Sequence, residues 1–315
     1  MITLLILYNI LKSAIDKNLT FTRSDGSAAY PYFQAKDFGV STSYFSFRSG
    51  KWMLHGSRYY VGNGPYKGVL IFFHGIGSGR NAYIKPICLF ALQGYLVYAF
   101  DYTGCMESEG PYIYGLGHVA YDEDAFFEWL DHDEIAQGYE RYVVGHSWGG
   151  YAALISSKPV YKVKKVISIS GFNRVSEELK CLNPKVDSKV LSFLMAFYFR
   201  DRNGKYGDLS GSDVLKKSSC DLLYIQGEAD SMVPPKAGYL SLQKDLKGRP
   251  NTNYFIVPGR GHQVFLSIES EKYINKMFDQ KLNSPEGPIG LKMSLEESGN
   301  ENKELLQTMF DFLSN

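Results

Sequence analysis

The stretch Arg141–Tyr151, R-Y-V-V-G-H-S-W-G-G-Y, constrains the fold of this chain more than any other segment. The apolar residues Tyr142, Val143 and Val144 are typical of the end of a buried strand. The sequence G-H-S-W-G follows at once, and a helix-favouring run begins after it. This order predicts a strand, a sharp turn and a helix, with the hydroxyl of Ser147 at the tip of the turn.

Glycine is expected on either side of Ser147 because a Cβ atom there would collide with the neighbouring strand and helix. The helix that follows directs free backbone N–H groups toward the same hydroxyl. Taken alone, the pentapeptide also fits a glycine-rich turn without chemistry. The rest of the chain must decide between these two interpretations.

Further apolar runs of strand length occur on both sides of this turn. Two alternating runs between Tyr44 and Val61 meet at Ser49-Gly50 and predict a hairpin. Near-continuous apolar runs, typical of strands buried on both faces, alternate with helical segments through much of the chain. These runs are Lys67–Phe73, Tyr95–Phe100, Val163–Ser170, Leu222–Ile225 and Tyr254–Val257. The alternation predicts an α/β fold with a mostly parallel sheet and right-handed crossovers.

The alternation stops between Phe172 and Cys220, where no buried strand is predicted. The dense apolar run Val190–Phe199 indicates a helical insertion that forms a lid, although a helix buried in the core has the same pattern. We therefore expect three parts. They are an N-terminal extension over residues 1–43, an α/β core over 44–172 and 220–315, and a helical lid over 173–219.

Composition limits the partners and the compartment. The chain has 315 residues and a net charge of +1, so no nucleic-acid partner is expected. Its four scattered cysteines lack C-x-x-C spacing, which favours free thiols, a cytoplasmic location and no metal site. The first eleven residues are apolar but too short to span a bilayer, and no signal-peptide pattern follows. We expect them to form a short helix that packs on the body, in preference to a signal or an anchor.

Four predicted strand ends carry residues with chemistry, namely the loop His74–Gly77, Ser147, Asp230 and His262. Because the carboxyl ends of parallel strands meet at one edge of a sheet, we expect these residues to lie close together. A serine hydroxyl needs an adjacent base, and His262 can accept and return its proton near neutral pH. Asp230 would hold the imidazole in the correct tautomer. Glu228 and Asp221 are rivals of Asp230, but Asp230 lies beyond the strand end, where the loop can curl toward His262.

The tetrahedral intermediate of such a reaction needs two hydrogen-bond donors for its oxyanion. We expect the backbone N–H of Trp148 and that of Ile76 to supply them, and loss of one donor costs about 3–4 kcal/mol. His74 and His146 are expected to be structural neighbours of the site. The substrate pocket is expected to include His74, Phe193 and Phe197. Asp101, also at a strand end, is expected to hold its own glycine-containing loop.

Five motifs in this order give the chain a clear resemblance to a known superfamily. They are F-F-H-G-I-G, D-Y-T-G-C-M-E-S-E-G, V-V-G-H-S-W-G-G-Y, Q-G-E-A-D-S-M-V-P and G-R-G-H, between Phe72 and His262. The chain resembles an α/β-hydrolase of the serine-hydrolase type, close to the S33 serine aminopeptidase, monoglyceride-lipase and dienelactone-hydrolase-like branches. The triad order Ser, Asp, His is that of this superfamily. Met106 departs from the pattern, since many relatives have glycine there.

The resemblance implies an eight-stranded, mostly parallel sheet with one antiparallel strand near its start. It also implies hydrolysis of an ester, thioester or amide through an acyl-enzyme, without a cofactor. Together with the predicted lid, this favours a carboxylic-ester hydrolase acting on a small-molecule ester with an apolar acyl portion. An aminopeptidase, amidase or acyltransferase on the same triad is the alternative, with Glu107 or Glu109 as an anchor for a substrate amine. A hydrolase fold retained as a ligand sensor is the non-enzymatic alternative. The sequence does not indicate the oligomeric state.

Overall fold

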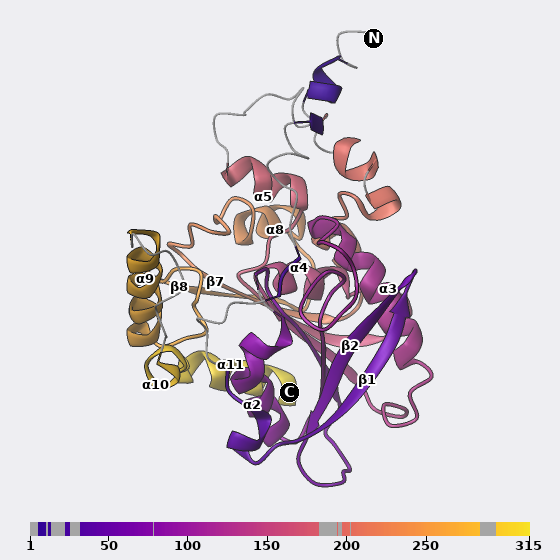
Figure 1. Ribbon diagram of the computed structural model, residues 1–315, viewed down its shortest axis with the longest axis vertical. Helices are drawn as coiled ribbons and strands as arrows, with labels where there is room; N and C mark the ends of the chain where they lie inside the picture. Colours follow the sequence, from indigo (N-terminus) through magenta and orange to yellow (C-terminus); the bar gives the residue numbers. More distant parts are fainter. Residues whose placement is uncertain are drawn as a thin grey trace.

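Eight strands form one sheet in the order β1-β2-β4-β3-β5-β6-β7-β8 (Figure 1). The computed structural model describes residues 6–10, 12–13, 23–25, 32–77, 79–182, 194, 197–201, 203–283 and 294–315. The strands are β1 (Ser41–Ser49), β2 (Trp52–Tyr60), β3 (Val69–Phe73), β4 (Leu96–Phe100), β5 (Arg141–His146), β6 (Val163–Ile169), β7 (Asp221–Gly227) and β8 (Thr252–Val257).

Strand β2 is antiparallel to both of its neighbours, β1 and β4. All other neighbouring pairs, from β4 and β3 through to β7 and β8, are parallel. The predicted α/β fold, with an eight-stranded sheet and one antiparallel strand near its start, is therefore confirmed. The predicted hairpin is β1-β2, and its first strand begins at Ser41, three residues before the expected start.

Helices cover both faces of the sheet. Helices α3, α4 and α8 pack on one face, and α2 and α11 pack on the other (Figure 1). The α-helices are α2 (Ile84–Leu92), α3 (Val119–Leu130), α4 (Trp148–Ile155), α5 (Val175–Leu182), α7 (Gly211–Leu215), α8 (Tyr239–Asp245), α9 (Ile268–Asn283), α10 (Leu295–Ser298) and α11 (Lys303–Ser314). Short 3-10 helices are η1 (Ala35–Phe38), η2 (Arg80–Tyr83), η3 (Leu116–His118), η4 (Pro159–Tyr161) and η6 (Gly204–Tyr206). Within the described ranges no helix is long and apolar enough to cross a membrane.

The central strands β3 and β4 are buried along their whole length, as their continuous apolar sequences predict. Aromatic side chains fill the core between the sheet and α3. The rings of Phe100 and Phe126 stack with centroids 4.7 Å apart, and the ring of Phe45 stacks on Trp129 at 4.6 Å. Full burial of such a side chain contributes about 1.5–3 kcal/mol, so this layer holds β1 and β4 against α3.

Two helices begin later than the local sequence indicates. Proline is well tolerated in the first turn of a helix, so Pro234-Pro235 predicts a helix start, but α8 begins only at Tyr239. The carbonyl of Pro234 instead accepts hydrogen bonds from the N–H groups of Ala237 and Gly238. These bonds close a turn before the helix. The sequence likewise predicts a helix from about Val264 onward, but α9 begins at Ile268.

The insertion between β6 and β7 contains α5, η6 and α7. Helix α5 lies beside α8 (Figure 1), where Ser241 Oγ donates a hydrogen bond to Glu177 Oε2 at 2.7 Å. Of the predicted apolar helix, residues 190–193 and 195–196 lie outside the described residues, and residues 197–201 are helical. The expectation that residues 173–219 form a lid stays a prediction.

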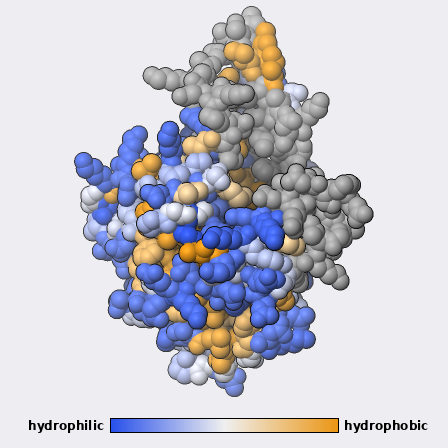
Figure 2. Space-filling model, turned by 90° about the vertical axis from the view of Figure 1, so that its left-hand side faces the viewer, coloured by the Kyte–Doolittle hydropathy of each residue, from blue (hydrophilic) through white to orange (hydrophobic). Residues whose placement is uncertain are grey.

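Residues 6–10 of the N-terminal segment are helical and contact this insertion. The Tyr8 ring meets that of Phe197 edge-on at 5.0 Å, and its hydroxyl donates to Asp201 Oδ2 at 2.8 Å. Apolar side chains are exposed at this N-terminal end of the molecule (Figure 2). Ile6, Leu7 and Ile10 are 54%, 44% and 61% exposed. The N-terminal segment thus packs through one side of its helix and leaves an apolar side uncovered.

Candidate active site

Ser147 lies in a strained turn between β5 and α4. Its φ is +60° and its ψ −121°, a conformation that L-residues rarely adopt and that clusters at functional sites. A Cβ atom on Gly145 would collide with the carbonyl of Gly149, and one on Gly149 would collide with the carbonyl of Phe73. The two flanking glycines are therefore required by close packing of the backbone, as the sequence predicts.

Asp230 and His262 meet in the loops that follow β7 and β8. His262 Nδ1 lies 2.9 Å from Asp230 Oδ2 and 3.1 Å from Oδ1. Asp230 Oδ1 also accepts hydrogen bonds from the N–H groups of Met232, at 3.0 Å, and Val233, at 2.9 Å. Burial alone would raise the pKa of Asp230, but these hydrogen bonds and the imidazole outweigh it and lower that pKa. A carboxylate with this environment stays ionised and can stabilise an imidazolium.

The two rival carboxylates lie elsewhere. Glu228 Oε2 accepts a hydrogen bond from the Gly259 N–H at 3.2 Å, and Asp221 begins β7 at the opposite end of the strand. Neither carboxylate makes a hydrogen bond to His262 within the described part of the chain. Among the three candidates, Asp230 is the one in contact with the imidazole.

The backbone of His262 is held close to Ser147. Its carbonyl oxygen lies 3.1 Å from His146 Nε2 and 3.1 Å from Ser170 Oγ. His146 directly precedes Ser147, so this contact joins the two loops. The Ser147 hydroxyl and the His262 imidazole do not share a hydrogen bond in the described chain. Catalytic hydrogen bonds are often long before substrate binds, so this geometry is compatible with a general base.

The loop of residues 74–77 after β3, called the oxyanion loop for the role predicted for it, passes beside Ser147. A Cβ atom on Gly75 would lie 3.4 Å from the Cβ atom of Ser147. The N–H groups of Ile76 and Trp148 have no hydrogen-bond acceptor among the residues that the structure describes. Trp148 is the first residue of α4, so its N–H also lies at the positive end of a helix. These groups are available as donors, and their role as an oxyanion hole stays a prediction.

The predicted pocket residues lie in different surroundings. His74 is buried at the start of the oxyanion loop. Its Nδ1 bonds to the Gly75 carbonyl at 2.8 Å, and its Nε2 accepts from the Tyr102 N–H at 3.3 Å. Burial lowers the pKa of His74 to about 4, so the ring is neutral. Phe197 is 51% exposed beside Tyr8, and Phe193 lies outside the described residues. Contact of these three with a substrate stays a prediction.

Sequence reasoning missed a buried ion pair that supports the oxyanion loop. The side chain of Arg80, which follows this loop, pairs with Asp101 at the end of β4 and with Glu107 at 2.6 Å. Asp101 also accepts a hydrogen bond from the Arg80 N–H at 2.8 Å. Asp101 therefore ties the loop after β3 to the loop after β4, in addition to the role expected for it in its own loop. Burial raises the pKa of Asp101 to about 6, although Arg80 opposes this shift.

A metal site is not formed by the residues that the structure describes, since no group of three or more His, Cys, Asp or Glu side chains is placed to bind an ion. The groups that the structure describes at this edge of the sheet include the hydroxyl of Ser147, the imidazole of His262 and the carboxylate of Asp230.

Residues 64–203 match the model of a family described as serine aminopeptidase, S33. That match includes Ser147, Ile76 and Trp148 but ends before Asp230 and His262. No curated protein sequence matches the chain.

Solved structures of hydrolases are similar to this fold. The Pyrococcus furiosus esterase Pf2001 aligns with a TM-score of 0.60 and 17% identity, over 82% of this chain and 97% of that chain. The 2,6-dihydroxy-pseudo-oxynicotine hydrolase aligns with a TM-score of 0.52 and 18% identity, over 71% and 62%. A Pyrococcus horikoshii acylaminoacyl peptidase aligns with a TM-score of 0.53 and 17% identity, over 71% and 37%. From its sheet order, its strained serine turn and these similarities, this chain is an α/β-hydrolase-fold protein.

Proposed function

We propose that this protein is a serine hydrolase that cleaves carboxylic esters with an apolar acyl portion. Ser147 is the nucleophile, His262 the general base and Asp230 the residue that orients His262. The observation that carries the proposal is the hydrogen bond of 2.9 Å between Asp230 and His262, beside a serine in a strained turn. The similarity to esterase and peptidase structures supports hydrolysis as the class of reaction.

The reaction follows from these groups. His262 takes the proton of Ser147 as the hydroxyl attacks the ester carbonyl, and Asp230 stabilises the imidazolium that forms. The N–H groups of Ile76 and Trp148 bind the oxyanion of the tetrahedral intermediate. His262 returns the proton to the leaving alcohol, and an acyl-enzyme remains on Ser147. Water then repeats the sequence and releases the acid.

An ester is favoured over an aminoacyl substrate because the two expected amine anchors are already engaged. Glu107 pairs with Arg80, and Glu109 Oε2 accepts a hydrogen bond from the Met53 N–H at 2.8 Å. An aminopeptidase needs a free carboxylate for the substrate amine. The peptidase alternative is kept because the family model and the acylaminoacyl peptidase structures are similar to this chain. A cytoplasmic location belongs to the same proposal, supported by the free thiols of Cys88, Cys105, Cys181 and Cys220.

Hydrolysis of p-nitrophenyl esters of increasing chain length, compared with aminoacyl arylamides, tests the proposal. We expect turnover of the esters, and we expect Ser147→Ala to lower kcat by about 10⁴-fold or more without loss of the fold. Faster turnover of the arylamides would favour the peptidase. Ester turnover that survives in Ser147→Ala would exclude this site, and a wild-type protein inactive on both substrate classes would favour a ligand sensor.

A further inference from the structure

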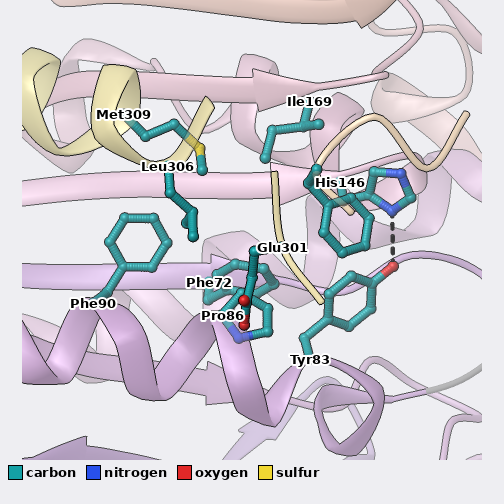
Figure 3. A pocket seen from close by; sticks show the side chains of 10 residues that line it. Phe72, Tyr83, Pro86, Phe90, His146, Ile169, Glu301, Leu306 and Met309 are labelled. Atoms are coloured by element: carbon teal, nitrogen blue, oxygen red, sulfur yellow. Dashed lines mark hydrogen bonds between the residues drawn. The ribbon is translucent and has the colours of Figure 1, made fainter. Parts of the chain in front are cut away.

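A chain of buried hydrogen bonds runs behind the candidate site, from the oxyanion loop to His262. The Gly75 N–H donates to Tyr83 Oη at 3.2 Å, and Tyr83 Oη lies 2.9 Å from His146 Nδ1 (Figure 3). His146 Nε2 lies 3.1 Å from the carbonyl oxygen of His262. Three segments that are far apart in the sequence are joined in this way.

The two ends of this chain fix the direction of every bond in it. The Gly75 N–H can only donate, and the His262 carbonyl oxygen can only accept. His146 Nε2 must therefore carry the proton, which leaves Nδ1 as an acceptor for the Tyr83 hydroxyl. The hydroxyl accepts from Gly75 and donates to His146, so each bond has one direction and no group in the chain of bonds is left unpaired.

The surroundings keep the pair dry and His146 neutral. Tyr83 is 7% exposed and His146 2% exposed, and the ring of Phe265 packs on both. A mostly apolar cavity borders them on the face of the sheet that carries α2 and α11 (Figure 3). Its lining includes Phe72, Phe90, Ile169, Leu306 and Met309. Burial, with a smaller contribution from the neighbouring His262, lowers the pKa of His146 to about 3.

We propose that Tyr83 and His146 are positioning residues, which hold the oxyanion loop and His262 in register with Ser147. The inference rests on the proposed hydrolase function. Asp230 fixes the imidazole of His262 at Nδ1, whereas His146 fixes the backbone of His262. The Tyr83 hydroxyl connects His146 to the N–H of Gly75. Gly75 directly precedes Ile76, whose N–H would bind the oxyanion. Misplacement of reacting groups by about 1 Å costs on the order of 10²-fold in rate.

Steady-state ester hydrolysis by Tyr83→Phe tests this inference, with Tyr142→Phe as the matched control. The Tyr142 hydroxyl is bonded to Glu140 Oε2 at 2.9 Å and lies near the start of β5, at the opposite end of that strand from Ser147. Tyr83→Phe is expected to lower kcat by about 10- to 100-fold with KM changed less than about twofold. Tyr142→Phe should retain wild-type kcat. Equal kcat values for wild type and Tyr83→Phe would overturn the proposal.

Substitutions of His146 separate the effect of its bond to the His262 carbonyl from the effect of its bond to the Tyr83 hydroxyl. Glutamine places an N–H near the position of Nε2 and can keep the bond to the His262 carbonyl, whereas leucine keeps neither bond. We expect His146→Gln to recover most of the kcat that His146→Leu loses. We also expect Tyr83→Phe to add little in the His146→Leu background, since the hydroxyl has already lost its acceptor. Fully additive losses, or no rescue by glutamine, would show that the residues act only through packing.

These outcomes are distinct from failure of the function itself. A wild-type protein without turnover contradicts the proposed hydrolase, whereas turnover that ignores Tyr83→Phe contradicts only the positioning role. If His146→Leu does not fold, Tyr83→Phe decides alone, with its unfolding midpoint measured beside its kcat.

Discussion

The loops after β5, β7 and β8 differ from the insertion between β6 and β7 in how they satisfy buried polar groups. In these loops, the carboxylate of Asp230 and both ring nitrogens of His146 have partners. In the insertion, Glu178 Oε2 and both side-chain polar atoms of Asn203 are buried and have no hydrogen-bond partner among the residues that the structure describes. Arg80 Nε and Tyr102 Oη, in the loops after β3 and β4, are in the same condition. A buried polar atom without a partner costs about 1–3 kcal/mol. The loops after β5, β7 and β8 are therefore organised for one geometry, whereas the insertion carries an unrelieved cost.

Catalysis and the choice of substrate make different demands on a fold. Reacting groups must hold their geometry before substrate arrives, and hydrogen-bonded loops at the ends of parallel strands meet that demand. The cost of a buried polar group without a partner is relieved when a new partner is supplied. Under the proposed function, we expect these loops to position the reacting groups and the insertion to contact the substrate.

The largest change in activity is expected in the loop after β7, where Asp230 contacts His262. Asp230→Asn should lower kcat by about 10³- to 10⁴-fold, because the amide favours the wrong tautomer of His262. Its unfolding midpoint should change far less than its activity. The measurement is steady-state ester hydrolysis beside urea unfolding, with Glu228→Gln as the control on the same loop. A value of kcat close to wild type for Asp230→Asn would break the assignment of this region.

A smaller and opposite effect is expected in the insertion at Glu178. Burial and the nearby charge of Asp230 raise the pKa of Glu178 to about 8, from an ordinary value of 4.5. Between these two values the folded state binds more protons than the unfolded state, so the stability contribution is lost as pH rises toward 8. Glu178→Gln should raise the free energy of unfolding by about 2–4 kcal/mol at pH 9 and change it little at pH 4.

Urea unfolding at the two pH values checks this prediction. Glu177→Gln, on the same helix, is the matched control, because its carboxylate is hydrogen-bonded by Ser241. The control should show a smaller dependence on pH. An equal effect of Glu178→Gln at both pH values would show that the charge of this side chain does not cause the change in the free energy of unfolding.

The smallest effect is expected at Asn203. Asn203→Leu removes two polar atoms that have no partner among the described residues, so it should raise the free energy of unfolding by about 1 kcal/mol. The matched control is Asn173→Leu at the edge of the same insertion. Asn173 Oδ1 accepts from the Ser212 N–H at 2.8 Å and Nδ2 donates to Ser241 at 2.8 Å, so this control should be destabilised. If both variants lose stability alike, the two asparagines are equally satisfied and the contrast between regions is wrong.

The sequence predicted what local patterns encode. Continuous apolar runs identified the buried strands, and the glycines around Ser147 identified the strained turn, because both patterns lie within a few residues. The contact of Asp230 with His262 was expected from the convergence of parallel strand ends, and the structure brings these two residues together.

The links between loops were not predictable in the same way. Asp101 binds Arg80 across 21 positions and Tyr83 binds His146 across 63 positions of the sequence. Such contacts depend on which side chains face one another after the sheet has formed. No periodic pattern of residues along the sequence predicts them. The start of α8 is also not predictable from the proline pair, since Pro234-Pro235 fits a turn as well as the first turn of a helix.

The proposed function requires that Ser147 is a nucleophile activated by His262. Labelling with a fluorophosphonate probe, followed by intact-mass and peptide mass spectrometry, measures this most directly. We expect one adduct per chain, on Ser147, formed rapidly by wild type and at least about 10³-fold more slowly by His262→Ala. An adduct on another residue, or equal labelling of the two proteins, would contradict it.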